Sequence, residues 1–254
     1  MPTSEDGQGS TPVYRTIAAA LRAAIASGDL ADGDRIPGEN ALMKRYGVAR
    51  ATARQALSML INEGIVTAVR GSGVYVRSFK PLRRHGPNRL SRELWGAGRA
   101  IWQADTADRG YTTDRIRIAT ADPPGHVARA LALADSDRVL LRSRRYSLDG
   151  RPVQLATSFL PAAIAAGTRI AEDDTGPGGI YARLAEMGHP PAHFTEEIRV
   201  RMPAPEEAEA LDLGPGVPVL AVVRTALTAD HDPVEVNEMT LDGSAYVLQY
   251  DFDA

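Results

Sequence analysis

Two arginines stand four residues apart in one short segment, Arg50 and Arg54. This spacing places two side chains on one face of a helix, and Ala53, Leu57 and Leu60 then fall on the opposite, apolar face. A guanidinium group can donate two parallel hydrogen bonds to the edge of a guanine or to a phosphate. The spacing therefore predicts a helix whose exposed arginines contact a DNA duplex.

Basic and polar residues on either side extend this pattern. Thr52 lies between the two arginines, and Arg35 precedes a helical segment that begins at Glu39. Basic side chains at such positions neutralise phosphates, and a glycine in a turn lets the backbone approach a duplex closely. The residues that we expect to contact DNA are Arg35, Glu39, Arg50, Thr52, Arg54, Arg70 and Gly71.

The distribution of charge supports this interpretation better than the net charge does. The whole chain has a formal net charge of -3 at pH 7, but residues 11–80 carry ten Lys or Arg against five acidic residues. That segment is therefore +5 and the remainder is -8. A polyanion responds to local charge, so the asymmetry favours nucleic acid as a partner of the basic segment. Without it, these arginines would be typical of an ordinary solvated face.

A second pair of arginines, Arg142 and Arg144, lies in a strand-like run. Because side chains alternate along a strand, both point to the same face. Two like charges side by side repel each other unless an anion or a carboxylate lies between them, so the pair could hold an anionic ligand. Alternatively, both arginines face solvent or pair with Glu196 and Glu197. The residues alone leave both interpretations open.

Acidic and amide side chains in other strand-like runs are further candidates. Glu196 shares a face with Phe194 and Ile198, and a carboxylate among apolar groups is costly unless it is paired. It is therefore either an arginine's partner or a ligand contact. The glycine-rich loop at 175–179 precedes a helix whose N–H groups could bind an anion, although such loops are more often plain turns. The residues that we expect to bind a small-molecule effector are Arg142, Arg144, Ser158, Glu196, Glu235 and Asn237.

Several classes of protein are disfavoured by what the sequence lacks. There is no cysteine, which excludes disulfides and thiolate metal sites, and the five histidines show no metal-ligand spacing. No HExxH motif, GxSxG elbow or Walker-type loop is present. We therefore expect no metal and no cofactor. No apolar run approaches the roughly eighteen residues needed to cross a bilayer, so we expect a cytoplasmic protein with no membrane partner.

Hydrophobic periodicity indicates the elements that position these residues. It predicts helices over 14–28, 39–46 and 50–63, followed by a β-hairpin formed by 65–69 and 74–76. Beyond residue 110, successive strands without intervening helices favour an antiparallel α+β domain. The strands are expected at 112–119, 139–147, 153–160, 195–202, 219–228, 234–241 and 246–252, and the helices at 127–133, 180–187 and 205–211.

These elements define the expected organisation of the chain, whose fold class is α+β. Residues 1–12 are expected to be a disordered tail, and 13–77 a winged helix-turn-helix. Residues 78–109, with scattered arginines, glycines and prolines, are expected to be a linker that docks on another part of the chain. Residues 110–254 form a second domain. No internal repeat is evident.

Residues 14–76 resemble the DNA-binding domain of the GntR family of bacterial regulators. The resemblance rests on YRTIAAALRAAIASGDLADGDRIPGENALMKRYGVARATARQALSMLINEGIV followed by RGSGVYV. It implies that DNA is contacted by Arg35, Arg50, Thr52, Arg54 and the wing at Arg70–Gly71.

Residues 139–252 resemble the UTRA ligand-sensing domain of the HutC subfamily, whose antiparallel-sheet fold is similar to chorismate lyase. Four stretches match in order: LLRSRRYSLDGRPVQLATSFLP, GPGGIYARLAEMGH, EEIRVRMPAPEEAEALDLGPGVPVLAVVRTA and DPVEVNEMTLDGSAYVLQYDF. The resemblance implies a homodimer in which effector binding changes the spacing of two DNA-reading heads. In the family, an arginine pair near Arg142 and Arg144 helps to hold an anionic group.

Four positions depart from the family pattern. Gly38 and Ala49 stand where the family usually has serine at a helix N-cap. An alanine there gives up about 1 kcal/mol of helix stability and a glycine only a few tenths. Ala156 and Leu241 stand where sugar-phosphate-sensing relatives carry an acid and a tyrosine, which argues against a sugar phosphate as effector.

Together these features predict a transcription regulator, acting as a repressor, that binds an inverted-repeat operator as a homodimer and responds to a small-molecule effector. One alternative is a DNA-binding protein that needs no ligand. The other is a lyase-like enzyme that uses His193, Glu196 or Glu235 for acid–base work. A shift of operator affinity with a metabolite, or turnover of one, would separate these three functions.

Overall fold

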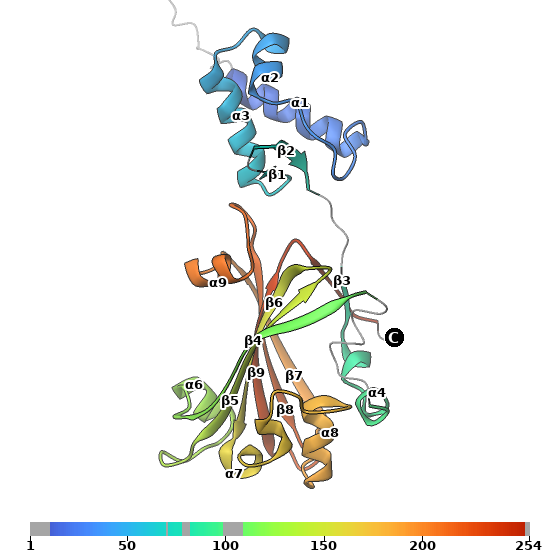
Figure 1. Cartoon of the computed structure of the whole chain (residues 1–254), viewed down its shortest axis with the longest axis vertical. Coiled ribbons are helices and arrows are strands. Elements are labelled where there is room, and N and C mark those ends of the chain that lie inside the picture. The colour runs from blue at the N-terminus through green and yellow to red at the C-terminus, as the bar shows by residue number, and fades with distance from the viewer. Residues whose placement is uncertain (1–10, 70, 78–81, 99–108, 252–254) are drawn as a thin grey trace, which may run out of the picture. The chain divides into compact units, whose positions relative to one another are not determined.

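The computed structural model describes residues 11–69, 71–77, 82–98 and 109–251. It divides into two compact units (Figure 1). The first extends to Phe79 and includes Gly214–Val217, and the second comprises Lys80–Leu213 and Pro218–Ala254. Arg70 and all but the last two residues of the expected N-terminal tail lie outside the described residues.

The first unit consists of three helices and a two-stranded hairpin. The helices are α1 (Val13–Ser27), α2 (Glu39–Tyr46) and α3 (Arg50–Asn62). Strands β1 (Val66–Val69) and β2 (Gly73–Val76) pair in antiparallel fashion and form the wing. Gly47 joins α2 to α3 with a left-handed backbone, which glycine adopts without steric cost. This order of elements is the predicted winged helix-turn-helix.

The periodic apolar residues of the helices form the core of this unit. Ile17 of α1, Leu42 of α2 and Leu60 of α3 are completely buried in it. Because the apolar face of α3 packs inward, its first turn presents Arg50 and Arg54 to solvent. Burial on one side of the helix thus determines which side chains are available on the other.

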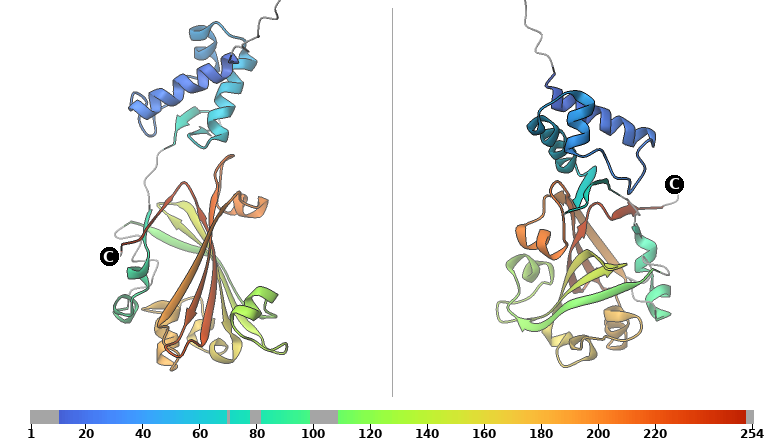
Figure 2. Two further views of the ribbon diagram at one scale, coloured as in Figure 1. Left: turned by 180° about the vertical axis from the view of Figure 1, so that it is seen from behind. Right: turned by 45° about the horizontal axis from the view of Figure 1, so that its top comes forward.

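The second unit is built on a six-stranded antiparallel sheet (Figures 1 and 2). The order of strands across the sheet is β4-β5-β6-β9-β8-β7, and all five adjacent pairs are antiparallel. The strands are β4 (Tyr111–Ala121), β5 (Val139–Leu148), β6 (Arg151–Pro161), β7 (His193–Arg201), β8 (Val219–Leu227) and β9 (Pro233–Asp242). The predicted α+β class is confirmed.

Short helices connect or flank these strands. They are α6 (Gly125–Ala130), α7 (Ala162–Ala165), η2 (Arg169–Ala171), α8 (Gly179–Glu186) and α9 (Pro205–Ala210). Figure 1 shows α7 and α8 at one end of the sheet and α9 at the other. Within the described parts of the chain, no helix combines the length and the apolar character needed to cross a membrane.

The sheet contains an internal repeat, contrary to the expectation from sequence. The series β4-α6-β5-β6 recurs as β7-α9-β8-β9, and the two series meet at the centre of the sheet, where β6 pairs with β9. The helices begin at Gly125 and Pro205, and the strands that follow them begin at Val139 and Val219. Each element of the first series therefore has a counterpart about 80 residues later.

Local irregularities repeat as well. After the helices, Ala132 and Asp212 both have positive φ, of 51° and 50°. The register of both hairpins shifts at the same place, directly before Ser147 in the first and Leu227 in the second. Part of the repeat is also present in the sequence, since Leu131, Leu133, Val139, Leu140 and Arg144 are identical to the residues 80 positions later. Inspection of the sequence for repeats missed this pattern.

The described part of the expected linker belongs to the second unit. It forms β3 (Leu82–His85), η1 (Pro87–Leu90) and α4 (Arg92–Gly96). Strand β3 pairs in parallel with β10 (Tyr246–Gln249), apart from the main sheet. Trp95 of α4 is buried in a cluster with Tyr181 and Leu184. Through these contacts the described part of the expected linker docks on the second unit.

Candidate functional site

The first turn of α3 brings the two expected base-reading arginines together on one carboxylate. Arg54 donates from Nε to Oε1 of Glu39 at 2.7 Å, and Nε of Arg50 lies 3.7 Å from Oε2. Arg50 also donates to Oδ1 of Asn40 at 3.2 Å. The hydrogen bond from Arg54 lowers the pKa of Glu39. Both arginine side chains are more than 60% exposed, so they are oriented by Glu39 yet open to solvent.

Arg35 belongs to the same surface. With Glu39 and Arg50 it lines a groove of about 790 Å³ in the first unit. Its guanidinium lies against Gly73, where a Cβ atom would come within 2.7 Å of Nε. Gly71 has a φ of +76° at the tip of the wing, and nothing lies within 4 Å of the position of its Cβ. Thr52 is half-buried in the first turn of α3.

The second unit contains a polar cavity over the two central strands. It encloses about 130 Å³ of space that water can enter. Three of the six predicted effector residues line it: Arg144, Glu235 and Asn237. The remainder of its lining consists of Arg89, Tyr146, Gln154, Ala156, Thr175, Gly178, Gly179, Ile180, Tyr181, Arg224 and Met239.

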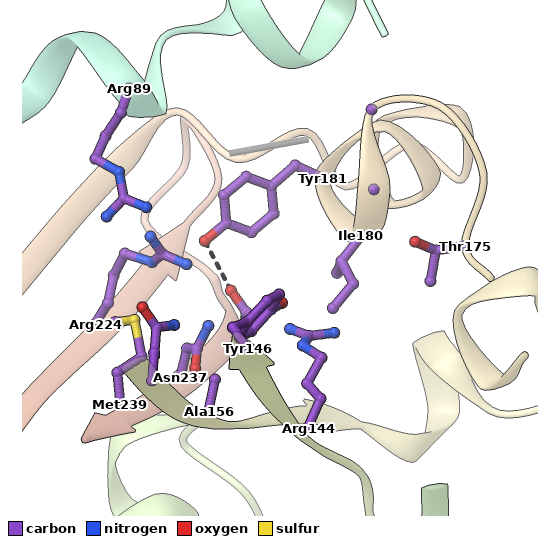
Figure 3. A pocket seen from close by; sticks show the side chains of 14 residues that line it. Arg89, Arg144, Tyr146, Ala156, Thr175, Ile180, Tyr181, Arg224, Asn237 and Met239 are labelled. Atoms are coloured by element: carbon purple, nitrogen blue, oxygen red, sulfur yellow. Dashed lines mark hydrogen bonds between the residues drawn. The ribbon is translucent and has the colours of Figure 1, made fainter. Parts of the chain in front are cut away.

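The cavity wall contains polar atoms that are buried without a hydrogen bond. Among the described residues these include Nε and Nη1 of Arg224, Nε of Arg144 and Oδ1 of Asn237. Arg224 is 4% exposed and stands over the ring of Tyr181, with its nearest carboxylate oxygen, on Glu196, at 3.8 Å from Nη1. Figure 3 shows Arg224 and Arg89 approaching the cavity from one side and Arg144 from the other.

Glu235 is the single carboxylate in this lining and is 1% exposed. Its Oε2 accepts a hydrogen bond from the hydroxyl of Tyr181 at 2.7 Å (Figure 3). Burial raises the pKa of Tyr181 well above its usual value, so the hydroxyl remains a donor at neutral pH. Although burial opposes its charge, nearby acidic groups, led by Tyr181 and Glu235, raise the pKa of Arg224. The cavity therefore holds fixed charges of both signs, with positive charge in excess.

Arg142 does not line the cavity, in contrast to its predicted neighbour Arg144. Its guanidinium is buried and donates to the backbone carbonyls of Ile170, Glu172 and Asp173. Burial, followed by repulsion from Arg144, lowers the pKa of Arg142 to about 10. The chain turns at this loop before it reaches Thr175 in the cavity wall, so Arg142 supports the wall from behind.

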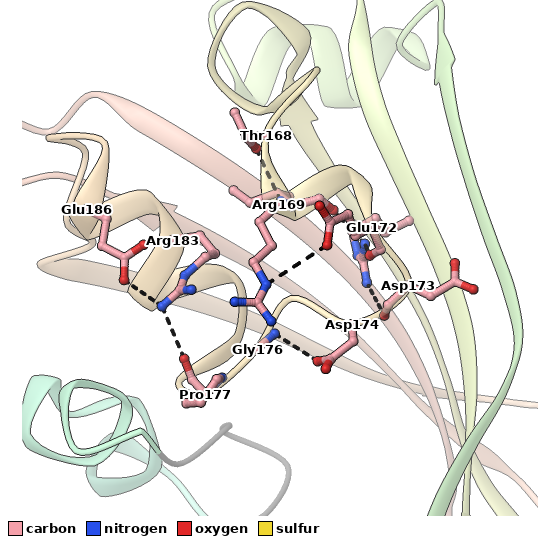
Figure 4. A network of polar contacts seen from close by, with 11 residues as sticks. Thr168, Arg169, Glu172, Asp173, Asp174, Gly176, Pro177, Arg183 and Glu186 are labelled. Atoms are coloured by element: carbon pink, nitrogen blue, oxygen red, sulfur yellow. Dashed lines mark hydrogen bonds and ion pairs between the residues drawn. The ribbon is translucent and has the colours of Figure 1, made fainter.

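Further hydrogen bonds hold the same loop in place (Figure 4). The N–H of Gly176 donates to Oδ1 of Asp174 at 2.8 Å, and Arg183 reaches the carbonyl of Pro177 at 3.4 Å. The hydroxyl of Thr168 accepts from the N–H of Ile170 at 3.2 Å. The loop is thus bonded both within itself and to Arg142.

The two other predicted effector residues lie outside the lining. Ser158 is buried and accepts a hydrogen bond from Nη2 of Arg144 at 3.1 Å, so it orients that arginine. Glu196 forms an ion pair with Arg84 of β3, and it also lies near Arg224. Of the two roles that the sequence left open for Glu196, the structure agrees with the partner of an arginine.

Sequence reasoning missed several residues of the cavity, among them Arg89, Tyr181 and Arg224. Arg89 lay in the expected linker, and Tyr181 looked like an ordinary core residue of a helix. Arg224 carried a signal that could have been found: it stands five residues after Val219, as Arg144 does after Val139. Recognising the repeat would have paired it with Arg144.

Comparison with known proteins agrees with this two-part architecture. Residues 13–76 match the gntR family of bacterial regulatory proteins, and residues 106–247 match the UTRA domain. The chain belongs to the GntR family. A transcriptional regulator of Streptomyces coelicolor with a helix-turn-helix is 32% identical and covers 95% of this chain and 93% of its own. The matched families and this relative are regulators, so the chain is a regulator of transcription and not an enzyme.

Solved structures share the folds of both units. A GntR-family transcriptional regulator of known structure has a TM-score of 0.67 at 27% identity, covering 96% of this chain and 98% of its own. PhnF from Mycobacterium smegmatis has a TM-score of 0.58 at 22% identity, covering 94% and 99%, and so shares the fold. By sequence alone, a further similar protein is a transcriptional regulator of Mycobacterium tuberculosis, which is 30% identical over 90% of this chain and 81% of its own.

Proposed function

We propose that this regulator is a repressor that binds operator DNA through α3 and the wing, and that a small molecule in the cavity of the second unit releases it. The observation that carries the DNA-binding part is the exposed pair Arg50 and Arg54, oriented by Glu39 at the first turn of α3. Exposed, pre-oriented guanidinium groups at the start of a recognition helix suit base edges in the major groove.

The residues around this pair would anchor the phosphates. Arg35 and the N–H groups near Gly71 flank the arginines in the chain's basic segment, and Thr52 supplies a hydroxyl beside them. We propose the predicted set, including Arg70 of the wing, as the DNA-contacting surface, with Glu39 as the residue that orients the arginines. A homodimer would present two such surfaces, so the operator would be an inverted repeat.

Release by a ligand is the mode that best accounts for the second unit. Its cavity has unfilled buried donors, and these would be costly to retain if nothing bound there. A relative that is 46% identical over 69 residues is the mannosyl-D-glycerate system repressor of Escherichia coli. Its name supports repression as the mode of action here. A ligand-independent DNA-binding protein would have no use for such a cavity.

Replacing Arg54 tests the DNA-binding proposal. Arg54→Ala should reduce binding to the operator, taken from the regulator's own upstream region, to the level of a scrambled duplex. The matched control is Arg22→Ala, because Arg22 bonds to Glu63 at the opposite end of α3. Fluorescence anisotropy measures both, and circular dichroism checks that each variant is folded. Operator binding by Arg54→Ala equal to that of the unmodified protein would refute the proposed surface.

A metabolite screen tests release by a ligand. The full chain, bound to labelled operator, is titrated with small organic anions until anisotropy falls. If no compound that stabilises the protein changes its affinity for the operator, the ligand-independent alternative gains support instead. Chemical turnover of a compound would contradict the assignment as a regulator.

A further inference from the structure

The polar cavity lies across the internal repeat, and its two principal arginines are repeat equivalents. Arg144 stands opposite Ala156 in the hairpin of β5 and β6, and Arg224 stands opposite Asn237 in the hairpin of β8 and β9. Strands β6 and β9 lie between them, so their backbones are about three strand spacings, roughly 14 Å, apart. Both side chains nevertheless line one cavity, reaching over the central strands from opposite sides (Figure 3).

The bonding of these two arginines is incomplete. Nε of each is buried without a hydrogen bond, as is Nη1 of Arg224. Arg142 also has an unbonded Nε, but it does not line the cavity, and its two Nη atoms donate to three backbone carbonyls. The unfilled donors of the cavity lining therefore point to Arg144 and Arg224, rather than to the adjacent pair Arg142 and Arg144, as the anchors of an anion.

The two halves differ where a ligand would meet the central strands. Gln154 is replaced in the second half by Glu235, and Ala156 by Asn237, each pair having equivalent register. Oδ1 of Asn237 lacks a partner, and the described hydrogen bonds of Glu235 leave Oε1 open. Acceptors are thus concentrated in the half that belongs to β9. A ligand that fills the site must offer hydrogen-bond donors on that side.

We propose that Arg144 and Arg224 grip one anionic group of the effector from the two halves of the repeat, while Glu235 and Asn237 accept hydrogen bonds from its O–H or N–H groups. This rests on the proposed function in one respect, that the cavity is the effector site. The ligand class is a compact phosphate, phosphonate or carboxylate that carries at least one hydroxyl or amino group. An anion supplies the missing acceptors of both arginines and offsets the excess of positive charge in the wall.

Phosphate stabilisation of the full chain tests the arginine anchor. Melting is followed by the fluorescence of tryptophan, since Trp95 is buried in the second unit, in 50 mM sodium phosphate and in sodium chloride of equal ionic strength. Phosphate should raise the melting temperature by about 2 °C or more. Arg144→Met and Arg224→Met should each abolish the shift, and Arg224→Lys should keep part of it.

Arg145→Met is the matched control for loss of a guanidinium. Arg145 follows Arg144 on β5 but pairs with Asp114 and does not line the cavity. The control should retain the full phosphate shift. An equal shift in Arg224→Met and the unmodified protein would overturn the role of Arg224. The absence of any shift in the unmodified protein would overturn the anion site.

A matched pair of compounds tests the acceptor half. Glycerol 3-phosphate and propyl phosphate share a carbon chain and a phosphate, but only the former carries hydroxyl groups. Calorimetry should show about tenfold tighter binding of glycerol 3-phosphate than of propyl phosphate, and Glu235→Gln should reduce this ratio. Equal affinities in the unmodified protein would contradict the acceptor role. These measurements contain no DNA, so their failure is distinct from failure of operator binding.

Discussion

Glu39 is an acidic side chain in the middle of a basic surface. It orients Arg50 and Arg54, and it also cancels part of the positive charge that would attract any DNA. We infer that a carboxylate in this position favours specific over non-specific binding, because pre-oriented arginines lose less freedom at the operator and the net attraction to phosphate is weaker. The DNA contact that the sequence predicts at Glu39 stays a prediction, and in the structure its carboxylate bonds to Arg54 and lies near Arg50.

Glu39→Gln should therefore raise affinity for scrambled DNA by about threefold or more and lower the ratio of specific to non-specific binding by a similar factor. Anisotropy titrations with operator and scrambled duplexes at several salt concentrations measure both. Glu63→Gln is the control, because it removes the same charge from an Arg–Glu pair elsewhere in the first unit. If the two variants lose specificity equally, net charge and not orientation is responsible.

Glu207 gives a pH-dependent contribution to the second unit. Hydrogen bonds from Arg201, the N–H of Ala204 and Thr240 hold its pKa at about 2, against the partial burial that opposes ionisation. A carboxyl whose pKa is lowered on folding stabilises the native state above its unfolded pKa near 4.5, and this contribution is lost as the pH falls toward 2.

Glu207→Gln should accordingly lower the free energy of unfolding at pH 7 by about 1 to 2 kcal/mol after allowance for solvent screening, and by less at pH 3. Urea unfolding followed by tryptophan fluorescence measures the difference. Glu197→Gln, an exposed member of a looser pair with Arg199, should change the free energy by about 0.5 kcal/mol or less at either pH. A deficit that does not shrink on acidification would contradict the argument.

At the scale of the element, the N-caps of α2 and α3 lack side-chain hydrogen bonds. Gly38 and Ala49 have extended backbones at these caps, as the sequence predicted, and no side chain accepts from the first turn of either helix. Four N–H groups at each helix start are without intrahelical partners, and a serine hydroxyl would satisfy one of them. Helix α3 is therefore less stable than it would be with a serine at its N-cap.

Ala49→Ser should stabilise α3 by about 1 kcal/mol, whereas Gly38→Ser should stabilise α2 by only a few tenths of that amount. Hydrogen–deuterium exchange of the helix amides in the full chain measures each effect locally. No gain in protection of α3 amides would show that the cap is not limiting. Ala49→Gly is the control, because it adds no hydroxyl and should give no side-chain cap.

The sheet of the second unit is built from a repeated series of elements. Two copies of one strand-helix-strand-strand series bury a common core, and their junction at β6 and β9 carries the cavity. Equivalent arginines from the two copies provide similar hydrogen-bond donors. The second copy has Glu235 and Asn237 where the first has Gln154 and Ala156, so the acceptors lie on its side of the cavity. A repeated backbone thus yields a site with two different sides.

At the scale of the whole molecule, residues 11–80 are positively charged and the rest of the chain is negatively charged. The salt dependence of DNA binding should therefore respond to charges in the first segment and not to those in the second unit. The logarithm of operator affinity should fall linearly with the logarithm of salt concentration, with a slope of about -0.9 for each phosphate neutralised. Arg35→Ala should reduce the steepness by about 1 for each subunit bound. Arg199→Ala, which removes the same charge from the second unit, should leave the slope unchanged. A flat salt response in the unmodified protein would contradict the electrostatic argument.

The sequence by itself determined most of the helices and strands, their order and the family, but not β3, η1, α4 or α7. Helices α2 and α3 and the strands of the sheet follow from local periodicity, glycine stops and alternation, each of which acts over a few neighbouring residues. The basic segment, residues 11–80, could also be recognised from the sequence, because counting charged residues along the chain does not require the fold. The expected boundaries, dimer, cytoplasmic location and site residues stay predictions.

Only the tertiary structure decided which polar side chains share a cavity. Tyr181 and Glu235 are bonded although 54 residues separate them, and Arg144 and Arg224 line one cavity although two strands lie between theirs. Alternation could place Arg142 and Arg144 on one face, but it could not show that backbone carbonyls of a distant loop occupy Arg142. Strand register and loop docking are set by burial between distant segments, and no local pattern contains that information.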